Sequence, residues 1–168
     1  MRSLARLFAR RRRRRGFGPE DYLKSVLALG TLGLVLLPLA ADATLAATRP
    51  AAASGGDCRI LRVIDGDTVD LWCAGQGHER ARLMGFDTPE LFSPSCQAEA
   101  RAAFAAKWAL RRALFQAEEL SLVREGTDRY GRGLWRVFIA GEPLAQHMIE
   151  QGHARPYGGE AREGWCDV

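Results

Sequence analysis

The chain has 168 residues, 47% of them hydrophobic and 26% charged, a composition that excludes a disordered protein and predicts one compact domain with at most an appendage. Its formal net charge of +4 would suit a partner such as nucleic acid or an anionic membrane, but the charges are unevenly placed. Residues 1–24 sum to +7, and everything from Ser25 onward sums to −3. The positive charge therefore belongs to the N-terminal tail.

The tail carries six consecutive arginines, Arg10–Arg15, ahead of an uncharged stretch rich in leucine and valine, Val26–Ala41. A basic segment before an apolar one is typical of an export signal, or of a membrane anchor whose N-terminus stays in the cytoplasm. We therefore expect a basic cytoplasmic region over 1–25 and a transmembrane anchor or signal segment over 26–43.

Two features of this segment make opposite predictions about whether it is cleaved or stays as a membrane anchor. Small residues at Ala41-Asp42-Ala43 favour cleavage of a signal. The long basic region, and Tyr22 and Leu23 beside the apolar stretch, favour an anchor of about 20 residues. We favour an anchor in the inner membrane, with a cleaved and secreted form as the alternative. In both cases the remaining chain is expected to be exported, on the periplasmic or extracellular face.

A linker is expected between this segment and the folded part. Residues 44–56 are Ala, Thr, Pro, Ser and Gly with a single Arg and a single Leu, and they show no apolar periodicity. The globular domain is therefore expected over 57–168, a length that supports a modest core.

All four cysteines lie in this expected domain, and because none forms a CxxC pair we expect two disulfides rather than a zinc site. Cys58 and Cys73 flank two short strand-like segments joined by an Asp-Gly turn dipeptide, so folding of the hairpin brings them opposite each other. Cys96 would then pair with Cys166 and tie the C-terminal end to the body of the domain.

Strand and helix patterns alternate along the domain. Phe104, Trp108 and Phe115 recur at helical spacing, as the apolar face of an amphipathic helix. The expected elements are strands at 59–64, 68–73 and 79–86, a helix at 97–117, strands at 120–124 and 133–139, and a helix at 143–151. Five short strands with a helix after the third predict a mainly β, α+β fold: a small Greek-key barrel of the OB type with two helices, whose open face can bind oligonucleotides.

Three segments bring acids and arginines to loops and strand ends: Asp65 to Thr68, Arg82 with Asp87 to Glu90, and Tyr130 to Arg132. Taken singly, each has an ordinary structural explanation, as a hairpin turn, a helix cap or a loop. Their joint occurrence is what points to chemistry.

Two carboxylates could share one rim of the sheet, because Asp67 leaves the first hairpin turn and Asp87 ends the third strand. Together with a loop carbonyl such as that of Thr88, they form an oxygen-rich site that suits calcium or magnesium. No His or Cys is placed to favour zinc.

Two arginines and one further acid complete this pattern. Arg82 and Arg132 beside a divalent cation would clamp a phosphate and stabilise charge on a five-coordinate phosphorus. Glu90, a carboxylate near the metal without a ligand role, could order or deprotonate the attacking water.

With these motifs the chain resembles the thermonuclease, or staphylococcal-nuclease-like, family, whose core motifs are a DGDT hairpin, an R-x4-DTPE segment and a YGR loop. The likeness runs from about Cys58 to Tyr157. It implies an OB-fold barrel and calcium-dependent hydrolysis of DNA and RNA phosphodiesters that leaves 3′-phosphate ends. It also implies these roles: one calcium ion held by Asp67, Asp87 and the Thr88 carbonyl, with Asp65 in support; phosphate binding by Arg82 and Arg132; Glu90 as general base; and a nucleotide pocket lined by Tyr130 and Tyr157.

The sequence departs from the pattern of this family in two places. The extended basic loop that precedes the long helix in the best-known members is missing, because the expected helix start at Gln97 follows Glu90 within seven residues. The third, C-terminal helix of those members is not expected either, since Gly158 to Cys166 is short and rich in glycine. The bridge from Cys96 would tie down that end instead.

Two other functions stay open as alternatives. The barrel could be a non-catalytic nucleic-acid-binding OB module tethered to the membrane, or an envelope protein whose barrel serves protein contacts. Binding alone has no need for Asp67, Asp87 and Glu90, which repel phosphate without a metal, and the paired Arg82 and Arg132 argue against protein contacts alone. The expected partners are DNA or RNA as substrate and a membrane, with no obligate protein partner.

Overall fold

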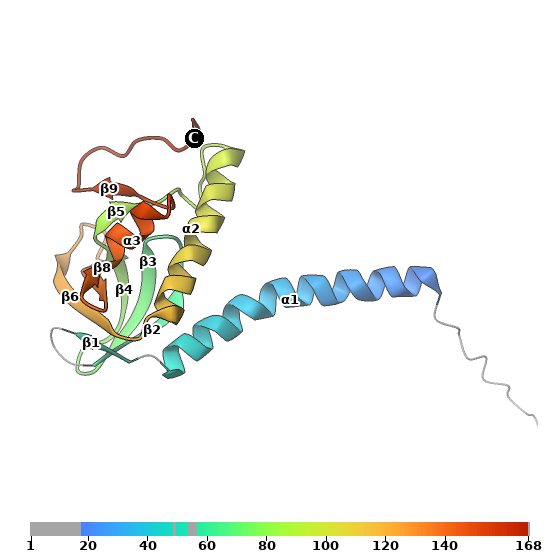
Figure 1. Ribbon diagram of the computed structural model, residues 1–168, viewed down its shortest axis with the longest axis horizontal. Helices are drawn as coiled ribbons and strands as arrows, with labels where there is room; N and C mark the ends of the chain where they lie inside the picture. The colour runs from blue at the N-terminus through green and yellow to red at the C-terminus, as the bar shows by residue number, and fades with distance from the viewer. Residues whose placement is uncertain (1–17, 49, 54–56, 168) are drawn as a thin grey trace, which may run out of the picture. The chain divides into compact units, whose positions relative to one another are not determined.

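The computed structural model describes residues 18–48, 50–53 and 57–167, so the arginine run at 10–15 lies outside it (Figure 1). The chain forms two compact units that divide within the first helix, one up to Leu36 and the other from Leu37 onward. The second unit holds all the described strands and the three motifs.

Helix α1 spans Pro19–Thr48 and begins with Glu20 and Asp21, whose negative charges favour the start of a helix. Over Pro19–Leu45 this helix is long and apolar enough to cross a membrane, with a mean hydropathy of 2.0. The expected anchor or signal segment at 26–43 lies within it.

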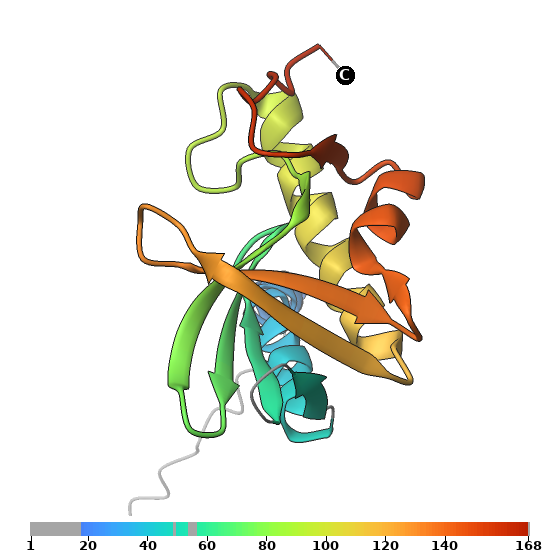
Figure 2. The same cartoon turned by 90° about the vertical axis from the view of Figure 1, so that its left-hand side faces the viewer.

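A curled sheet forms the body of the second unit. Its strands lie in the order β4-β3-β2-β1-β6-β7-β8, and β4 also pairs with β7, so the sheet closes on itself (Figure 2). This arrangement confirms the expected α+β fold with an OB-like barrel. The strands are β1 (Pro50–Ala53), β2 (Cys58–Val63), β3 (Thr68–Cys73), β4 (Gly77–Leu83), β6 (Leu120–Thr127), β7 (Gly133–Ile139) and β8 (Glu142–Pro143).

Part of the range 44–56, where we expected a linker, is regular structure. Helix α1 continues to Thr48, and β1 pairs antiparallel with β2 and parallel with β6. Residues 49 and 54–56 lie outside the described part of the chain. The barrel thus incorporates backbone whose composition alone suggests a linker.

A second, two-stranded sheet consists of β5 (Gly85–Asp87) and β9 (Arg155–Tyr157), which pair antiparallel. The single strand expected at 79–86 is therefore two strands, with a break at Met84. Gly85 has a φ of +95°, a left-handed conformation that favours glycine, and this bend lets the chain leave the barrel before Asp87.

Two helices accompany the barrel, α2 (Gln97–Gln116) and α3 (Leu144–Glu150), and α2 begins at the expected residue. The expectation that the aromatic stripe of α2 faces the core is wrong, since Phe104 and Phe115 are 51% and 46% exposed. The face turned to the core carries small and aliphatic side chains instead, which lets the helix lie close to the strands. These are Ala103, Ala106, Ala109, Leu110, Ala113 and Leu114.

Two disulfides join distant parts of the second unit. Cys58–Cys73 links the start of β2 to the end of β3, and Cys96–Cys166 links the N-cap of α2 to the C-terminal segment. This is the pairing that the hairpin pattern suggested. The described residues after β9 contain no helix, so the second disulfide anchors an irregular segment.

Candidate active site

The three motifs converge on one cleft of about 1060 Å³ in the second unit. Its walls are the turn after β2, the end of β4, the loop after β5, the β6–β7 loop and the segment after β9. Asp87 and Thr88 are buried beside the cleft, in contact with Arg82 and Asp67 respectively. The residues expected from the sequence that line the cleft are Asp65, Asp67, Arg82, Glu90, Tyr130, Arg132 and Tyr157.

The turn between β2 and β3 packs closely against the loop after β5 because its central residue is Gly66. A Cβ atom at this position would come within 2.6 Å of Thr88 Oγ1 and 2.9 Å of the Ala106 Cβ, so only glycine fits. The backbone N–H of Asp67 donates to Asp65 Oδ1 at 3.1 Å. The turn thus brings two acids next to Thr88.

The Asp67 carboxylate joins this turn to β4 and to the loop after β5. Its Oδ2 accepts hydrogen bonds from the Thr88 N–H at 3.3 Å and from the Thr88 hydroxyl at 3.0 Å. The same oxygen forms an ion pair with Arg82 Nη1. Because Asp67 is buried, its negative charge depends on these partners.

Arg82 is buried and bridges the two acids that the sequence singled out as metal ligands. One guanidinium nitrogen pairs with Asp67, and Nη2 donates to Asp87 Oδ1 at 3.2 Å. Burial lowers the pKa of Arg82. The positive charges of Arg162 and Arg132 lower this pKa further, whereas the negative charge of Asp87 raises it. Arg132 and Arg162 therefore lie near enough to Arg82 for their positive charges to repel its guanidinium.

Burial raises the pKa of Asp65 above its ordinary value. The hydrogen bonds with Thr68 and the charge of Arg82 lower this pKa, but burial outweighs them. A nearby cation stabilises the ionised form of such a carboxyl. Asp65 lines the cleft, so a cation bound in the cleft would favour its ionised form.

The loop between β6 and β7 holds Arg132 through one acid, Asp128. The backbone N–H groups of Tyr130 and Arg132 donate to Asp128 Oδ1 at 2.8 and 2.9 Å, and Arg132 Nε donates to Oδ2 at 2.7 Å. Burial alone would raise the pKa of Asp128, but these hydrogen bonds outweigh it and hold the pKa below its ordinary value. The guanidinium of Arg132 is thereby fixed at the cleft wall.

Glu90 is positioned through its backbone, which leaves its side chain 41% exposed. Its N–H donates to Glu99 Oε1 at 3.2 Å, and the other Glu99 oxygen accepts from the Ser95 N–H at 2.6 Å. The Ser95 hydrogen bond is the main reason that the pKa of Glu99 lies below its ordinary value. Glu99 thus holds both ends of the loop that carries Glu90.

Two tyrosines lie where a nucleotide pocket was expected. Tyr130 is 69% exposed in the β6–β7 loop, with Arg129 Nη2 donating to its hydroxyl at 2.7 Å. Tyr157 ends β9, opposite Gly85. Both line the cleft, and their roles stay predictions.

The structure adds three residues that the sequence pattern did not mark: Glu99, Arg162 and Trp165. Glu99 could have been found, because an acid three residues after an N-cap is a familiar helix-start signal. Arg162 and Trp165 belong to no motif. The C-terminal segment brings Arg162 to the cleft wall and Trp165 to Asp87.

The residues expected to hold a cation fit one by their chemistry. Within the described residues, no three His, Cys, Asp or Glu side chains gather as metal ligands. The expected set differs, because it combines the carboxylates of Asp67 and Asp87 with a carbonyl, that of Thr88. Arg82 contacts both carboxylates, so one cationic group already reaches both, and their oxygens suit a hard cation such as calcium.

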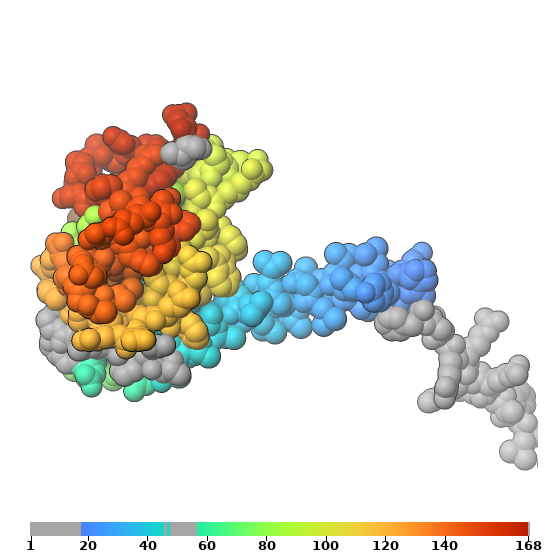
Figure 3. All heavy atoms as spheres, in the orientation of Figure 1, coloured from blue at the N-terminus to red at the C-terminus, as the bar shows by residue number. Residues whose placement is uncertain are grey.

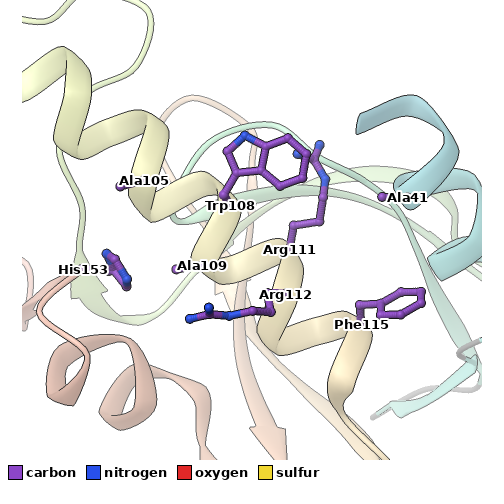
Figure 4. A pocket seen from close by; sticks show the side chains of 8 residues that line it. All are labelled: Ala41, Ala105, Trp108, Ala109, Arg111, Arg112, Phe115 and His153. Carbon is purple, nitrogen blue, oxygen red and sulfur yellow. The ribbon is translucent and has the colours of Figure 1, made fainter. Parts of the chain in front are cut away.

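A second hollow, of about 530 Å³, lies along α2 (Figure 4). The Arg111 guanidinium lies 4.7 Å from the centre of the Trp108 ring in its wall. None of the described residues that line it is an acid, so it lacks the groups for phosphodiester chemistry. They are Ala41, Ala105, Trp108, Ala109, Arg111, Arg112, Phe115 and His153.

Comparison with known proteins gives a consistent result. Residues 80–164 match the family model described as Staphylococcal nuclease homologue. The chain is 35% identical over 96 residues to a thermonuclease of Staphylococcus intermedius, covering 57% of this chain and 56% of the relative. It is 31% identical to a thermonuclease of Staphylococcus hyicus, covering 58% of this chain and 57% of that relative. It is also 31% identical to an uncharacterized endonuclease of Haemophilus influenzae, covering 60% of this chain and 52% of that relative.

The chain thus spans about half the length of the curated relatives it matches. The family model covers Arg82, Asp87, Glu90 and Arg132 but begins after the turn that carries Asp67. The geometry of that turn therefore adds information that the family match does not contain.

Proposed function

Because the chain belongs to the family of staphylococcal nuclease homologues, we propose that it is a calcium-dependent endonuclease that hydrolyses DNA or RNA phosphodiesters outside the cytoplasm and leaves 3′-phosphate ends. The observation that carries this proposal is the cleft in which the acids and arginines of three separate segments meet. The thermonucleases and the endonuclease among the relatives support nuclease chemistry in general.

Asp67, Asp87 and the carbonyl of Thr88 would hold one calcium ion. When bound, this ion would supply positive charge next to the phosphate and lower the pKa of a water molecule. Asp65, beside Asp67 in the same turn, would add negative charge behind the ligands.

Arg82 and Arg132 would bind the phosphate and stabilise the charge that develops on phosphorus. Each guanidinium is already oriented by an acid, Arg82 by Asp67 and Asp87, and Arg132 by Asp128. Little side-chain freedom is therefore lost when the phosphate binds, which favours binding.

Glu90 would accept a proton from the attacking water. Its backbone is fixed by Glu99, while its exposed carboxylate can turn toward solvent in the cleft. Tyr130 and Tyr157 would contact the sugar or base of the nucleotide, because aromatic rings at a cleft wall stack on bases of any sequence.

We also propose that α1 stays attached to the domain as a membrane anchor. Asp42 accepts two hydrogen bonds from Arg111, at 2.7 and 2.8 Å, and both residues are buried. Cleavage after Ala43 would remove Asp42 and leave the Arg111 charge buried without a partner, which is costly. A full-length protein in the membrane pellet supports the anchor, and a shorter protein in the soluble fraction contradicts it.

The proposed nuclease activity is tested with the full chain in detergent micelles, supplied with plasmid DNA, single-stranded DNA or RNA. We expect cleavage with calcium and none with a chelator. Glu90→Gln should reduce the rate by about 10² to 10⁴, the usual range for a general base. End-labelling of the products should show 3′-phosphates.

Glu118→Gln is the matched control, since this exposed carboxylate lies between α2 and β6 and does not line the cleft. Cleavage that is equally fast in chelator, or unaffected by Glu90→Gln, contradicts the mechanism. Binding of DNA without any cleavage under oxidising conditions with calcium would instead support the non-catalytic binding module.

A further inference from the structure

The segment after β9, residues 158–167, crosses one end of the cleft without regular structure. It contributes four residues to the cleft wall: Gly159, Glu160, Ala161 and Arg162. In Figures 1 and 3 it runs from β9 toward the start of α2, where its red atoms lie against the yellow-green ones. None of the three sequence motifs includes this segment, so its side chains have no assigned role.

Four contacts hold the far end of this segment in place. Cys166 is bonded to Cys96, the N-cap of α2. Trp165 is buried, with its ring 3.9 Å from the Arg155 guanidinium and its Nε1 donating to Asp87 Oδ2 at 3.4 Å. Arg155 Nη1 also donates to the Gly164 carbonyl at 2.9 Å. The segment is thus attached to α2, to β9 and to a predicted metal ligand.

These contacts place the guanidinium of Arg162 between two acids of the site. Its Nε lies 2.9 Å from Asp87 Oδ1, and its Nη1 donates to Glu90 Oε2 at 3.4 Å. Nη2 has no hydrogen-bond partner among the described residues. The side chain is 43% exposed, so one edge of the guanidinium is open to the cleft.

The position of Arg162 next to Asp87 and Glu90 is unusual for a surface ion pair. Isolated ion pairs on a protein surface join two exposed side chains and contribute little to stability. Here the Asp87 side chain is only 8% exposed and is shared with Arg82, so two guanidinium groups approach the same carboxylate. The planar guanidinium offers two parallel N–H donors, the arrangement that recognises two oxygens of a phosphate.

We propose that Arg162 binds a phosphate group of the nucleic-acid substrate, as a third arginine beside Arg82 and Arg132, and that the disulfide-anchored segment 158–167 is part of the active site. This inference rests on the proposed nuclease function and extends it to a residue outside the family motifs. Asp87 and Glu90 hold the guanidinium in place until a phosphate takes over one of its edges.

Three variants of the full chain in detergent test this assignment. Arg162→Gln removes the charge and the two parallel N–H donors, and Arg162→Lys keeps only the charge. Arg112→Gln removes one charge from the outer face of α2 and is the control. For Arg162→Gln with calcium we expect KM for single-stranded DNA to rise about tenfold, as for loss of one charge-assisted contact. A change in kcat of less than about twofold is expected, since the contact binds substrate in both ground and transition states.

A second measurement does not depend on catalysis. Binding of a fluorescent single-stranded oligonucleotide is followed by anisotropy in chelator at low ionic strength, over a series of salt concentrations. Arg162→Gln should reduce the slope of log affinity against log salt by about 0.7 relative to wild type, the value for one phosphate contact on a single strand. Arg162→Lys should restore the slope but only part of the affinity, and Arg112→Gln should leave KM unchanged.

The anchoring is tested by Cys96→Ser with Cys166→Ser, which should raise KM as Arg162→Gln does. The inference is overturned if Arg162→Gln has the same KM and the same salt slope as the wild type. It is also overturned if this variant has the wild-type KM but binds calcium more tightly, because Arg162 would then only occupy the place of the cation. A wild-type KM in the disulfide variant overturns the role of the anchor. If the wild type does not cleave at all, the proposed function fails, while the anisotropy data still decide the role of Arg162.

Discussion

The buried pair of Asp42 and Arg111 offers a direct test of how the end of α1 joins the domain. Asp42→Asn keeps the shape of the side chain and one hydrogen-bond acceptor but removes the negative charge. Arg111, 4% exposed, would then keep its positive charge without a counter-charge. The Trp108 ring, 4.7 Å from its guanidinium, compensates only a fraction of a lost ion pair.

The expected cost follows from this burial. Removing one partner of a buried ion pair typically costs about 3–5 kcal/mol. The protein can limit this cost by releasing the end of α1 from α2, which exposes Leu45, now 1% exposed, at about 1.5–3 kcal/mol. We therefore expect a loss of about 2–3 kcal/mol, or roughly 30- to 150-fold in the folding equilibrium.

The assay is urea unfolding of the full chain in detergent, followed by tryptophan fluorescence, because all four tryptophans lie beyond residue 57. The matched control is Asp42→Leu with Arg111→Met, which replaces the pair by apolar side chains and should be close to neutral. A loss below about 0.5 kcal/mol for Asp42→Asn, the level of a surface substitution, would refute the pairing and the argument for an uncleaved anchor.

Three further predictions concern the cleft and the barrel. Gly66→Ala places a methyl group against Thr88 and should cost about 1–3 kcal/mol in urea unfolding and reduce cleavage, whereas Gly30→Ala, in α1 with open space around it, should leave cleavage unchanged. The pKa of Glu79 is held below its ordinary value of 4.5 mainly by the Arg124 hydrogen bond, so its contribution to stability is complete above about pH 4.5 and lost as pH falls through the lower folded value. Glu79→Gln should therefore reduce the acid dependence of the unfolding free energy, and an unchanged dependence contradicts this role. Without calcium the chain should bind single-stranded DNA weakly and with a shallow salt slope, and tight, steeply salt-dependent binding in chelator would favour the binding module.

Much of the fold and of the cleft could be predicted because the relevant signals are local. The Asp-Gly turn and the alternation around it fix the first hairpin, and strand pairing then places Asp67 next to Arg82, which contacts Asp87 on β5. The acids and arginines of the motifs lie at strand ends, so a correct strand order was enough to bring Arg82 and Arg132 to one cleft. Their chemical roles stay predictions.

The errors and omissions arise where long-range packing decides the outcome. The stripe of Phe104, Trp108 and Phe115 has the period of a buried face, but alanines occupy the opposite face and pack against the barrel more closely. Strand β1 has no hydrophobic alternation and forms through pairing with β2 and β6. Arg162 lies in the segment that a disulfide between residues 70 positions apart joins to α2, and no local pattern marks it.

The charge of the second unit and its expected substrate can be reconciled through one residue, Asp87. The chain from Asp57 onward carries three more acidic than basic residues, so it does not attract a polyanion by net charge. Each cleft arginine named in the proposals is instead paired with an acid, and Asp87 pairs with two of them, Arg82 and Arg162. Engagement of this one carboxylate by a divalent cation would therefore weaken two ion pairs at once, and both guanidinium groups would then bind a phosphate more strongly than they do without the cation. Under the proposed mechanism, the acids that repel the substrate in the absence of a cation would thus couple its binding to the cation.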